Sequence, residues 1–353
     1  MKQLTIAVPA YNAEQYIEKC LDSMVNSKNA EGISPDPRLE VIVVNDGSKD
    51  GTEAKVKEYE KRFPDTVKLI TKENGGHGSG INTGIKAASG RYFKVVDSDD
   101  WVETENIPAI LDTLEKLEAD VVVTGYKSIN ERTRNVQEYS TVCGYANKII
   151  GMDEFAKIFQ SIGASYQFHG LCYRTDFFKD LDLRLTEKVS YEDQEYAVLP
   201  FAKAETIMIL PYFFYDYRLG SSGQTVDYKN QASHAEDMKL VIKRMVDYHI
   251  NARFEAGESW SASRERFFTQ RLAMAVTSYY ATVMVKAANK ANGRKLAEGF
   301  RQYIENAEPA VAKHSEGKYK KLLKASKTPF AAAAYRKLSN MKSYQKFKTK
   351  WVK

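Results

Sequence analysis

Three carboxylates follow a short apolar segment in the first third of the chain. Residues 92–96 are aromatic or β-branched apart from one lysine, and they are followed by Asp97, Asp99 and Asp100. Such a run predicts a buried strand, and charges placed directly after it need a partner or solvent. Asp97 and Asp99 are two residues apart, so they point the same way on an extended chain, and paired oxygen donors suit Mg²⁺ or Mn²⁺ shared with a phosphate. The alternative is a solvated turn in which Ser98 and the Asp side chains bond the local backbone.

The size and composition of the chain indicate a globular protein of about two domains. It has 353 residues and three cysteines, Cys20, Cys143 and Cys172, which form no CxxC pair. We therefore expect a reducing, cytoplasmic location. The N-terminus lacks the apolar run of a signal peptide, and no segment of about 18 apolar residues predicts a membrane span.

The charge is distributed unevenly. The net charge is +6, but residues 317–353 contain twelve Lys or Arg and no Asp or Glu, which leaves 40 basic and 46 acidic residues elsewhere. A basic tail on an acidic body favours a polyanionic partner such as an anionic membrane surface, a nucleic acid or a polyphosphate. A solvated, Lys-rich helical face is the alternative.

The first 125 residues alternate between strand and helix patterns. We predict strands over residues 4–8, 39–44, 67–70, 92–96 and 120–124, and helices over 13–24 (with Asn12 as its N-cap), 50–63, 81–88 and 105–117. This alternation predicts a doubly wound, mostly parallel sheet, in which ligands bind beyond the carboxyl ends of the strands. The polar segments 9–12, 45–48, 72–80 and 97–100 all follow strands, so we expect them to converge on one edge.

The remainder changes character along its length. Residues 126–150 read as irregular or antiparallel, followed by helices over 152–162, 175–181 and 192–201, a strand over 207–210 and a Gly/Ser loop over 220–225. From residue 232 onward only helical patterns occur, over 232–248, 261–288 and 293–304. We therefore expect a catalytic domain over 1–228 and a helical domain over 229–353.

The glycine-rich segment 73–80, ENGGHGSG, matches no phosphate-binding motif closely. It lacks the GxxxxGK[ST] and GxGxxG patterns, and GxSxG is also absent. It remains a weak candidate for an amide cradle around a phosphate, and His77 is either part of that site or a loop residue without chemistry.

Four motifs together resemble the family 2 glycosyltransferases, which have the GT-A fold. They are VPAYNAEQYIEKCLDSM, VIVVNDGSKDGT, ENGGHGSGINTGIKAASGRYFKVVDSDDWV and SYEDQEYAVLP, and their order and strand context match over about residues 1–220. The resemblance implies an inverting transfer of a sugar from a nucleotide diphosphate, usually UDP, with Mn²⁺ or Mg²⁺ as the cofactor. Residues 1–100 would form the nucleotide-binding half and 101–228 the acceptor half.

The resemblance also implies roles for individual residues. The nucleotide-sugar would contact Pro9, Ala10, Tyr11, Asn12, Asp46, Lys72, Asn74, Gly75, Gly76, His77, Asp97, Ser98 and Arg218. Within this set Asp46 would accept from the uracil N3–H, and Asp97 would lie on the ribose side. Asp97 and Asp99 would be the metal-binding pair, with Asp99 on the metal that bridges the diphosphate.

The catalytic base would come from the last motif. Asp193 would remove the proton from the acceptor hydroxyl, next to Glu192; without the resemblance, this pair would be read as acidic capping at a helix start. Asp100 is expected to orient the acceptor, and Trp101 either stacks on a sugar or packs after its strand.

One later segment and one departure complete the comparison with the family. Tyr217-Arg218 with Ser221-Ser222 is similar to a segment that closes over the diphosphate, where an Arg suits a phosphate. Many members carry Ala-Arg-Asn where this chain has Gly80-Ile81-Asn82, so the arginine is missing and the identity of the sugar stays open.

We therefore expect a cytoplasmic glycosyltransferase that extends a surface glycan such as a capsule, exopolysaccharide or cell-wall polymer. The acceptor would be a lipid-linked glycan or polyol-phosphate chain, and the basic tail would hold the enzyme peripherally at the anionic inner face of the membrane. The alternatives are a transferase acting on a protein or protein-linked glycan, and a non-catalytic nucleotide-sugar or glycan-binding protein of the same fold. We expect no nucleic-acid partner, and the sequence is compatible with a homo-oligomer.

Overall fold

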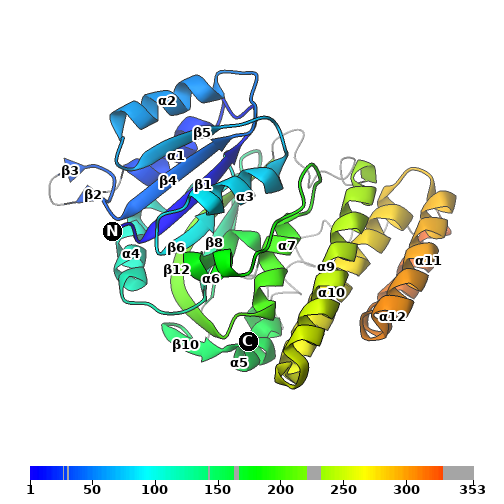
Figure 1. Cartoon of the computed structure of the whole chain (residues 1–353). Coiled ribbons are helices and arrows are strands. Elements are labelled where there is room, and N and C mark those ends of the chain that lie inside the picture. Colours follow the sequence, from blue (N-terminus) through cyan, green and yellow to red (C-terminus); the bar gives the residue numbers. More distant parts are fainter. Residues whose placement is uncertain (27, 30–31, 142–143, 163–166, 221–231, 329–353) are drawn as a thin grey trace. The chain divides into compact units, whose positions relative to one another are not determined.

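The computed structural model describes residues 1–353 except 27, 30–31, 142–143, 163–166, 221–231 and 329–353 (Figure 1). The chain divides into two compact units: residues 1–155 with 162–221, and residues 156–161 with 222–353. The expected domain boundary, near residue 228, lies outside the described residues. The same holds for Cys143, Ser221 and Ser222.

The first unit is built on a large mixed sheet with the order β10-β12-β8-β11-β6-β1-β4-β5. Its parallel part consists of β1 (Leu4–Ala10), β4 (Leu39–Asn45), β5 (Val67–Thr71) and β6 (Tyr92–Val95). Every residue of β1 and β4 is buried, as expected of strands covered on both faces. These strands confirm the predicted doubly wound core.

Short helices connect the strands of this half (Figure 1). They are α1 (Ile17–Val25), α2 (Thr52–Arg62), α3 (His77–Ala87) and α4 (Ile107–Glu115), the last preceded by the 3₁₀ turn Thr104–Asn106. Two small antiparallel strands, β2 (Lys28–Asn29) and β3 (Gly32–Ile33), pair with each other in the loop before β4.

The rest of the first unit extends the sheet with antiparallel pairs and one long parallel pair, between its two longest strands. Its strands are β7 (Trp101–Val102), β8 (Val121–Asn130), β9 (Asn135–Tyr139), β10 (Lys148–Gly151), β11 (Leu171–Arg174) and β12 (Thr206–Leu219). The helical segments are α5 (Met152–Ile162), a 3₁₀ turn at Phe168–Gly170, α6 (Thr175–Asp180), α7 (Asp193–Val198) and a second 3₁₀ turn at Leu199–Ala202. Strand β12 is 14 residues long, far beyond the predicted four, because it runs beside β8 with two register shifts and also pairs with β7.

Two predicted helix starts are wrong. Helix α1 begins at Ile17, and Asn12 does not cap it: Asn12 has φ 51°, and its side chain accepts from the Lys49 amide. Helix α3 begins at His77, four residues before the predicted start, so the second half of the glycine-rich segment is the first turn of a helix. Glycine has poor helix propensity, and only tertiary packing offsets this cost.

The second unit consists of α9 (Ala235–Ala256), α10 (Ala262–Ala281), α11 (Lys290–Ala307) and α12 (Pro309–Ser326), with a 3₁₀ turn at Gly257–Ser259 and a π-helical turn at Thr282–Lys286. Part of the basic tail belongs to this packing, because Tyr319 and Leu322 of α12 are buried. Residues 329–353 of the tail lie outside the described residues. Across the described helices, none is both long enough and apolar enough to cross a bilayer.

Candidate active site

The ends of β1, β4 and β5 surround an open cavity of about 560 Å³. Its lining residues are Tyr11, Asn45, Gly47, Ser48, Lys49, Glu53, Thr71, Lys72, Glu73 and Asn74. Tyr11 is 53% exposed, so its ring is accessible to a ligand. Pro9 and Ala10 of the same motif are buried in β1, with Pro9 against Gly80, and neither lines the cavity. The backbone N–H of Asn12 donates to Ser48 Oγ, so Asn12 holds the β1 and β4 ends together.

Asp46 lies between the lining residues Asn45 and Gly47 and organises the loop after β5. Its carboxylate accepts from Lys72 Nζ at 2.8 Å and from the amides of Gly75 and Gly76 at 2.9 and 2.7 Å. Its backbone carbonyl accepts from Asn74 Nδ2 at 2.9 Å. Asp46 is only 3% exposed. Four predicted nucleotide-binding residues are thus joined in one network around a buried carboxylate.

A histidine joins the Asp97 turn to the last motif. His77 Nε2 lies 2.8 Å from Asp97 Oδ1, and His77 Nδ1 lies 2.6 Å from Glu192 Oε1. Burial would lower the pKa of His77, but the charge of Asp97 and the hydrogen bonds to both carboxylates hold it well above its usual value. The protonated ring therefore donates to both carboxylates and neutralises part of their charge. His77 therefore lies in the first turn of α3, between two carboxylates, and its role in the reaction stays a prediction.

Asp193 lies at the first position of α7, directly after Glu192. Burial raises the pKa of Asp193 to about 6, with a further contribution from the charge of Glu192. A carboxylate with a pKa near 6 is well matched to proton transfer near neutral pH. Glu192 is 2% exposed and bonded to His77, so Asp193 is the more accessible of the pair.

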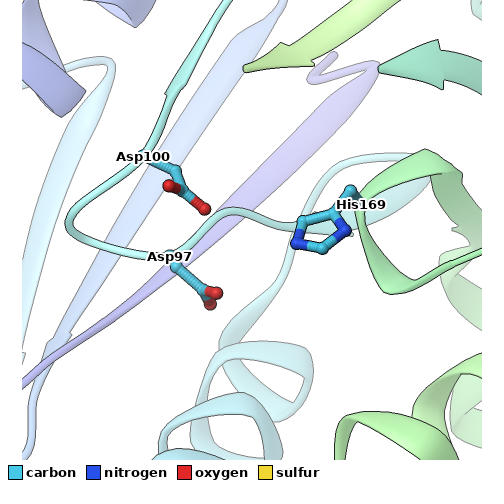
Figure 2. A group of neighbouring side chains, drawn as sticks. All are labelled: Asp97, Asp100 and His169. Carbon is cyan, nitrogen blue, oxygen red and sulfur yellow. The ribbon is translucent and has the colours of Figure 1, made fainter. Parts of the chain in front are cut away.

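One cluster of metal-ligand side chains occurs among the described residues. Asp97, Asp100 and His169 each present a ligand atom, and these atoms lie within 4.8 Å of one another. Figure 2 shows one ring nitrogen of His169 directed toward the two carboxylates. Oxygen donors suit Mg²⁺ and Mn²⁺, and imidazole is a ligand of transition metals, so the mixed set fits Mn²⁺ best.

His169 was missed by the sequence interpretation, because no motif surrounds it. It precedes β11, and the fully buried Lys94 of β6 holds its backbone carbonyl at 2.6 Å. The ring packs against Tyr215 and Tyr217, with centroids 4.8 and 4.3 Å away. Burial lowers the pKa of His169 to about 4, so the ring is neutral near pH 7 and able to ligate a metal. The one feature of the sequence that pointed to this region was Lys94, a charged residue within an apolar strand, which needs a buried hydrogen-bond acceptor such as the His169 carbonyl.

The structure corrects the expected acceptor role of Asp100. Asp100 is 1% exposed, and it accepts from the Tyr215 hydroxyl and, at 2.7 Å, from the Arg218 amide. Burial raises its pKa well above the usual value, and the charges of Asp97 and Asp99 add to this effect. An acceptor sugar has no access to such a carboxyl.

The other predicted residues near this turn lie at its rim. Ser98 is half-buried, and Asp99 is 36% exposed and lies 3.7 Å from Arg218 Nη1. The guanidinium of Arg218 pairs with Glu131 at 2.8 Å, over the ring of Tyr16.

Trp101 pairs within the sheet at Asp216 of β12, as the packed alternative requires, but its ring is also covered by Lys19, with Nζ 3.0 Å from the ring centroid. Trp101 is therefore packed in this unit, and its stacking on a sugar stays a prediction.

The fold and this convergent strand edge define a GT-A type glycosyltransferase. The model of the glycosyl transferase family 2 matches residues 5–188. The uncharacterized glycosyltransferase EpsJ of Bacillus subtilis is 30% identical over 259 residues, which cover 72% of this chain and 68% of EpsJ. The chain therefore belongs to glycosyl transferase family 2 and is an enzyme, which sets aside the non-catalytic alternative.

Relatives with named substrates are more distant. The poly(ribitol-phosphate) beta-N-acetylglucosaminyltransferase TarS of Staphylococcus aureus is 26% identical over 250 residues, 70% of this chain but only 41% of TarS. The crystal structure of TarS 1–349 in complex with UDP-GlcNAc matches 93% of this chain and 92% of that one, with a TM-score of 0.55 and 21% identity. The likeness to this structure shows the shared GT-A fold.

Proposed function

We propose that this glycosyltransferase moves a sugar, with inversion, from a UDP-sugar to a hydroxyl of a growing surface glycan. The acceptor oxygen attacks the anomeric carbon while the bond from that carbon to the diphosphate oxygen breaks. The electron pair leaves with UDP, and the acceptor proton passes to Asp193. The base and the leaving group lie on opposite faces of the sugar, as inversion requires.

The chain of contacts Asp97–His77–Glu192 is the observation that carries this proposal. It brings the segment expected to bind the donor next to the segment expected to hold the base, in one compact unit. The neighbouring cavity with Tyr11, Lys72 and Asn74 offers an aromatic ring, a cation and an amide, which suit a base, a phosphate and a ribose.

A divalent cation, preferably Mn²⁺, fits the residues beside the donor site. Asp97, Asp100 and His169 would hold it, and Asp99 at the rim remains the ligand that the family resemblance predicts. When bound, such a cation neutralises the charge that develops on the diphosphate. The side chains themselves would provide the Asp97 carboxylate, which is held by His77, the buried Asp100 carboxyl and the neutral imidazole of His169.

The acceptor we favour is a cell-envelope polymer, because the chain is related to poly(ribitol-phosphate) glycosyltransferases. Residues 1–100 would bind the nucleotide and 101–228 the acceptor. The helical domain, residues 229–353, would assist acceptor recognition at the cytoplasmic face of the membrane. A protein or protein-linked glycan is the second candidate acceptor, and a homo-oligomer is compatible with either acceptor.

Donor hydrolysis tests the proposed chemistry without knowledge of the acceptor. We expect the wild type with Mn²⁺ to release UDP from UDP-GlcNAc or UDP-glucose, and Asp193→Asn to lose about 100-fold or more in kcat, as removal of a general base does. Retained turnover in Asp193→Asn would exclude it as the base. The control is Glu305→Gln, a substitution of an exposed residue in the helical unit, which should leave kcat unchanged.

Metal binding is measured separately from activity. We expect isothermal titration to detect Mn²⁺ in the presence of UDP, and His169→Ala to weaken Mn²⁺ affinity about tenfold or more. If His169→Ala binds Mn²⁺ as the wild type does while Asp99→Ala does not, the ligands are the Asp97–Asp99 pair and His169 is not among them.

A further inference from the structure

We propose that the first turn of α3 is the platform that positions the catalytic segment, and that His77 is the positioning residue that holds Asp193 in place. This inference rests on the proposed role of Asp193 as the base. It assigns the glycine-rich segment to the base side of the site as well as to the nucleotide side.

The segment that precedes the base is bonded directly to α3 and its loop. The side chain of Asn82 accepts a hydrogen bond from the Leu185 amide through Oδ1 at 2.9 Å. It also donates to the Leu185 carbonyl through Nδ2 at 3.0 Å, so one side chain satisfies both backbone groups of Leu185. The Lys188 amide donates to the Gly75 carbonyl at 2.8 Å. These bonds join residues more than 100 positions apart and fix the path of residues 185–188.

Two glycines permit this close approach. A Cβ at Gly78 would lie 2.3 Å from the Thr186 carbonyl oxygen and 2.9 Å from Glu192 Cγ. Gly76 has φ 84°, and a Cβ there would lie 3.0 Å from the Lys188 amide nitrogen. Glycine at both positions is therefore explained by contact with residues 186–192, without reference to a phosphate.

His77 makes the contact nearest to the base. Its two ring nitrogens bond Asp97 and Glu192, and the Glu192 side chain is almost fully buried. Glu192 immediately precedes Asp193, so the bond from His77 fixes the position from which α7 starts. Ile81, one helical turn after His77, is fully buried, so no polar side chain at that position supplements this contact.

The expected consequence is a separation of turnover from nucleotide binding. Without the imidazole, the carboxylates of Asp97 and Glu192 face each other without a donor between them, and the start of α7 shifts. The nucleotide cavity is lined by other residues, including Tyr11, Lys72 and Asn74, and keeps its shape. A displacement of about 1 Å at a reacting group costs about 100-fold in rate.

The test compares His77→Ala and His77→Gln with Lys86→Ala, an exposed substitution in the same helix. We measure UDP affinity with Mn²⁺ by titration calorimetry, and kcat for hydrolysis of UDP-GlcNAc or UDP-glucose. For His77→Ala we expect kcat to fall about 100-fold with a UDP Kd within about threefold of the wild type. His77→Gln, whose amide can still donate, should recover part of kcat, and Lys86→Ala should match the wild type.

Two results would overturn the inference. One is a loss of UDP affinity in His77→Ala as large as the loss of kcat, which would make His77 a donor ligand. The other is unchanged kcat in both His77 variants. Gly78→Ala is the second variant, because it alters no polar side chain of the site, and it should lower kcat with unchanged UDP affinity. Turnover that survives in Asp193→Asn would instead refute the base, whatever the His77 variants do.

Discussion

At the scale of single residues, neighbouring side chains give each carboxyl group of this site a different environment. Asp46, Asp97, Asp193 and Glu192 all carry carboxyl groups, but each has a different environment. Asp46 is held by two amides and a lysine, whereas burial raises the pKa of Asp193 to about 6. Burial would also raise the pKa of Asp97, but the charge of His77 outweighs it and keeps that pKa below the usual value. Identical functional groups thus acquire separate roles from their neighbours.

The raised pKa of Asp193 predicts the pH dependence of the reaction. A base must be deprotonated, so kcat/KM should rise about tenfold per pH unit below pH 6 and level off above it. Measuring kcat/KM for hydrolysis of a UDP-sugar between pH 4.5 and 8 gives this pH profile. If the rise of kcat/KM has its midpoint near pH 4, Asp193 is either solvated like an ordinary carboxylate or is not the base.

At the scale of elements, helix α3 contributes to the fold and to the site through different residues. Its first turn meets the catalytic segment, while Gly84 further along faces β1. A Cβ at Gly84 would lie 2.6 Å from the Ala7 Cβ. The distance between this helix and the sheet therefore depends on one missing methyl group.

Gly84→Ala is accordingly expected to destabilise the protein, although alanine is the better helix former. Overpacking of this kind costs about 1–3 kcal/mol, more than the roughly 1 kcal/mol that helix propensity returns. Gly299→Ala in α11 is the matched control, since a Cβ there meets nothing within 4 Å and should stabilise its helix. Thermal unfolding of both variants measures the difference, and equal shifts would contradict the packing argument.

The helical unit has a polar cluster of its own between its helices. Glu265 of α10 accepts from His249 at 3.0 Å, Arg253 at 3.1 Å and Trp260 at 2.8 Å. Burial would raise the pKa of Glu265, but these partners, His249 first among them, lower it to about 2. The folded pKa lies below the ordinary 4.5, so this contribution to stability is complete above pH 4.5 and is lost as the pH falls toward 2.

Glu265→Gln is expected to loosen this unit. The substitution removes the negative charge of the carboxylate to which His249 and Arg253 both donate, and it weakens the pairing of the fully buried His249. We expect the free energy of unfolding to fall by about 1–3 kcal/mol. Hydrogen exchange of residues 235–326 should accelerate near pH 7. Glu305→Gln, which breaks an exposed pair with Arg301, should change exchange little. Similar exchange in the two variants would show that the cluster is not stabilising.

At the scale of the whole molecule, the basic tail is not a uniform segment. Tyr319 and Leu322 pack within the helical unit, and the Tyr319 hydroxyl donates to Glu298 at 2.6 Å. These two side chains therefore belong to the core of the helical unit. Residues 329–353 still contain seven Lys or Arg and no acidic residue.

A membrane role should therefore be tested by truncation after Thr328, which leaves α12 intact. We expect the full chain to co-sediment with vesicles containing anionic lipid and the truncated chain to bind much less, because each basic residue near such a surface contributes about 1 kcal/mol. Neutral vesicles and high salt are the controls. Equal binding of the two proteins to anionic vesicles would eliminate the tail as a membrane anchor.

Local patterns were sufficient to predict the parallel core and the edge where the motifs meet. Strand and helix periodicity is a property of neighbouring residues, and parallel strands bring their carboxyl ends together whatever lies between them. Packing between distant segments was needed for the rest. The contact of His77 with Glu192 spans 115 residues, and the cluster of Asp97 and Asp100 with His169 depends on how β11 is placed. The buried Asp100 is bonded by two residues of the distant strand β12. No short stretch of sequence contains such long-range contacts, and they determine which carboxyl group is available for each step.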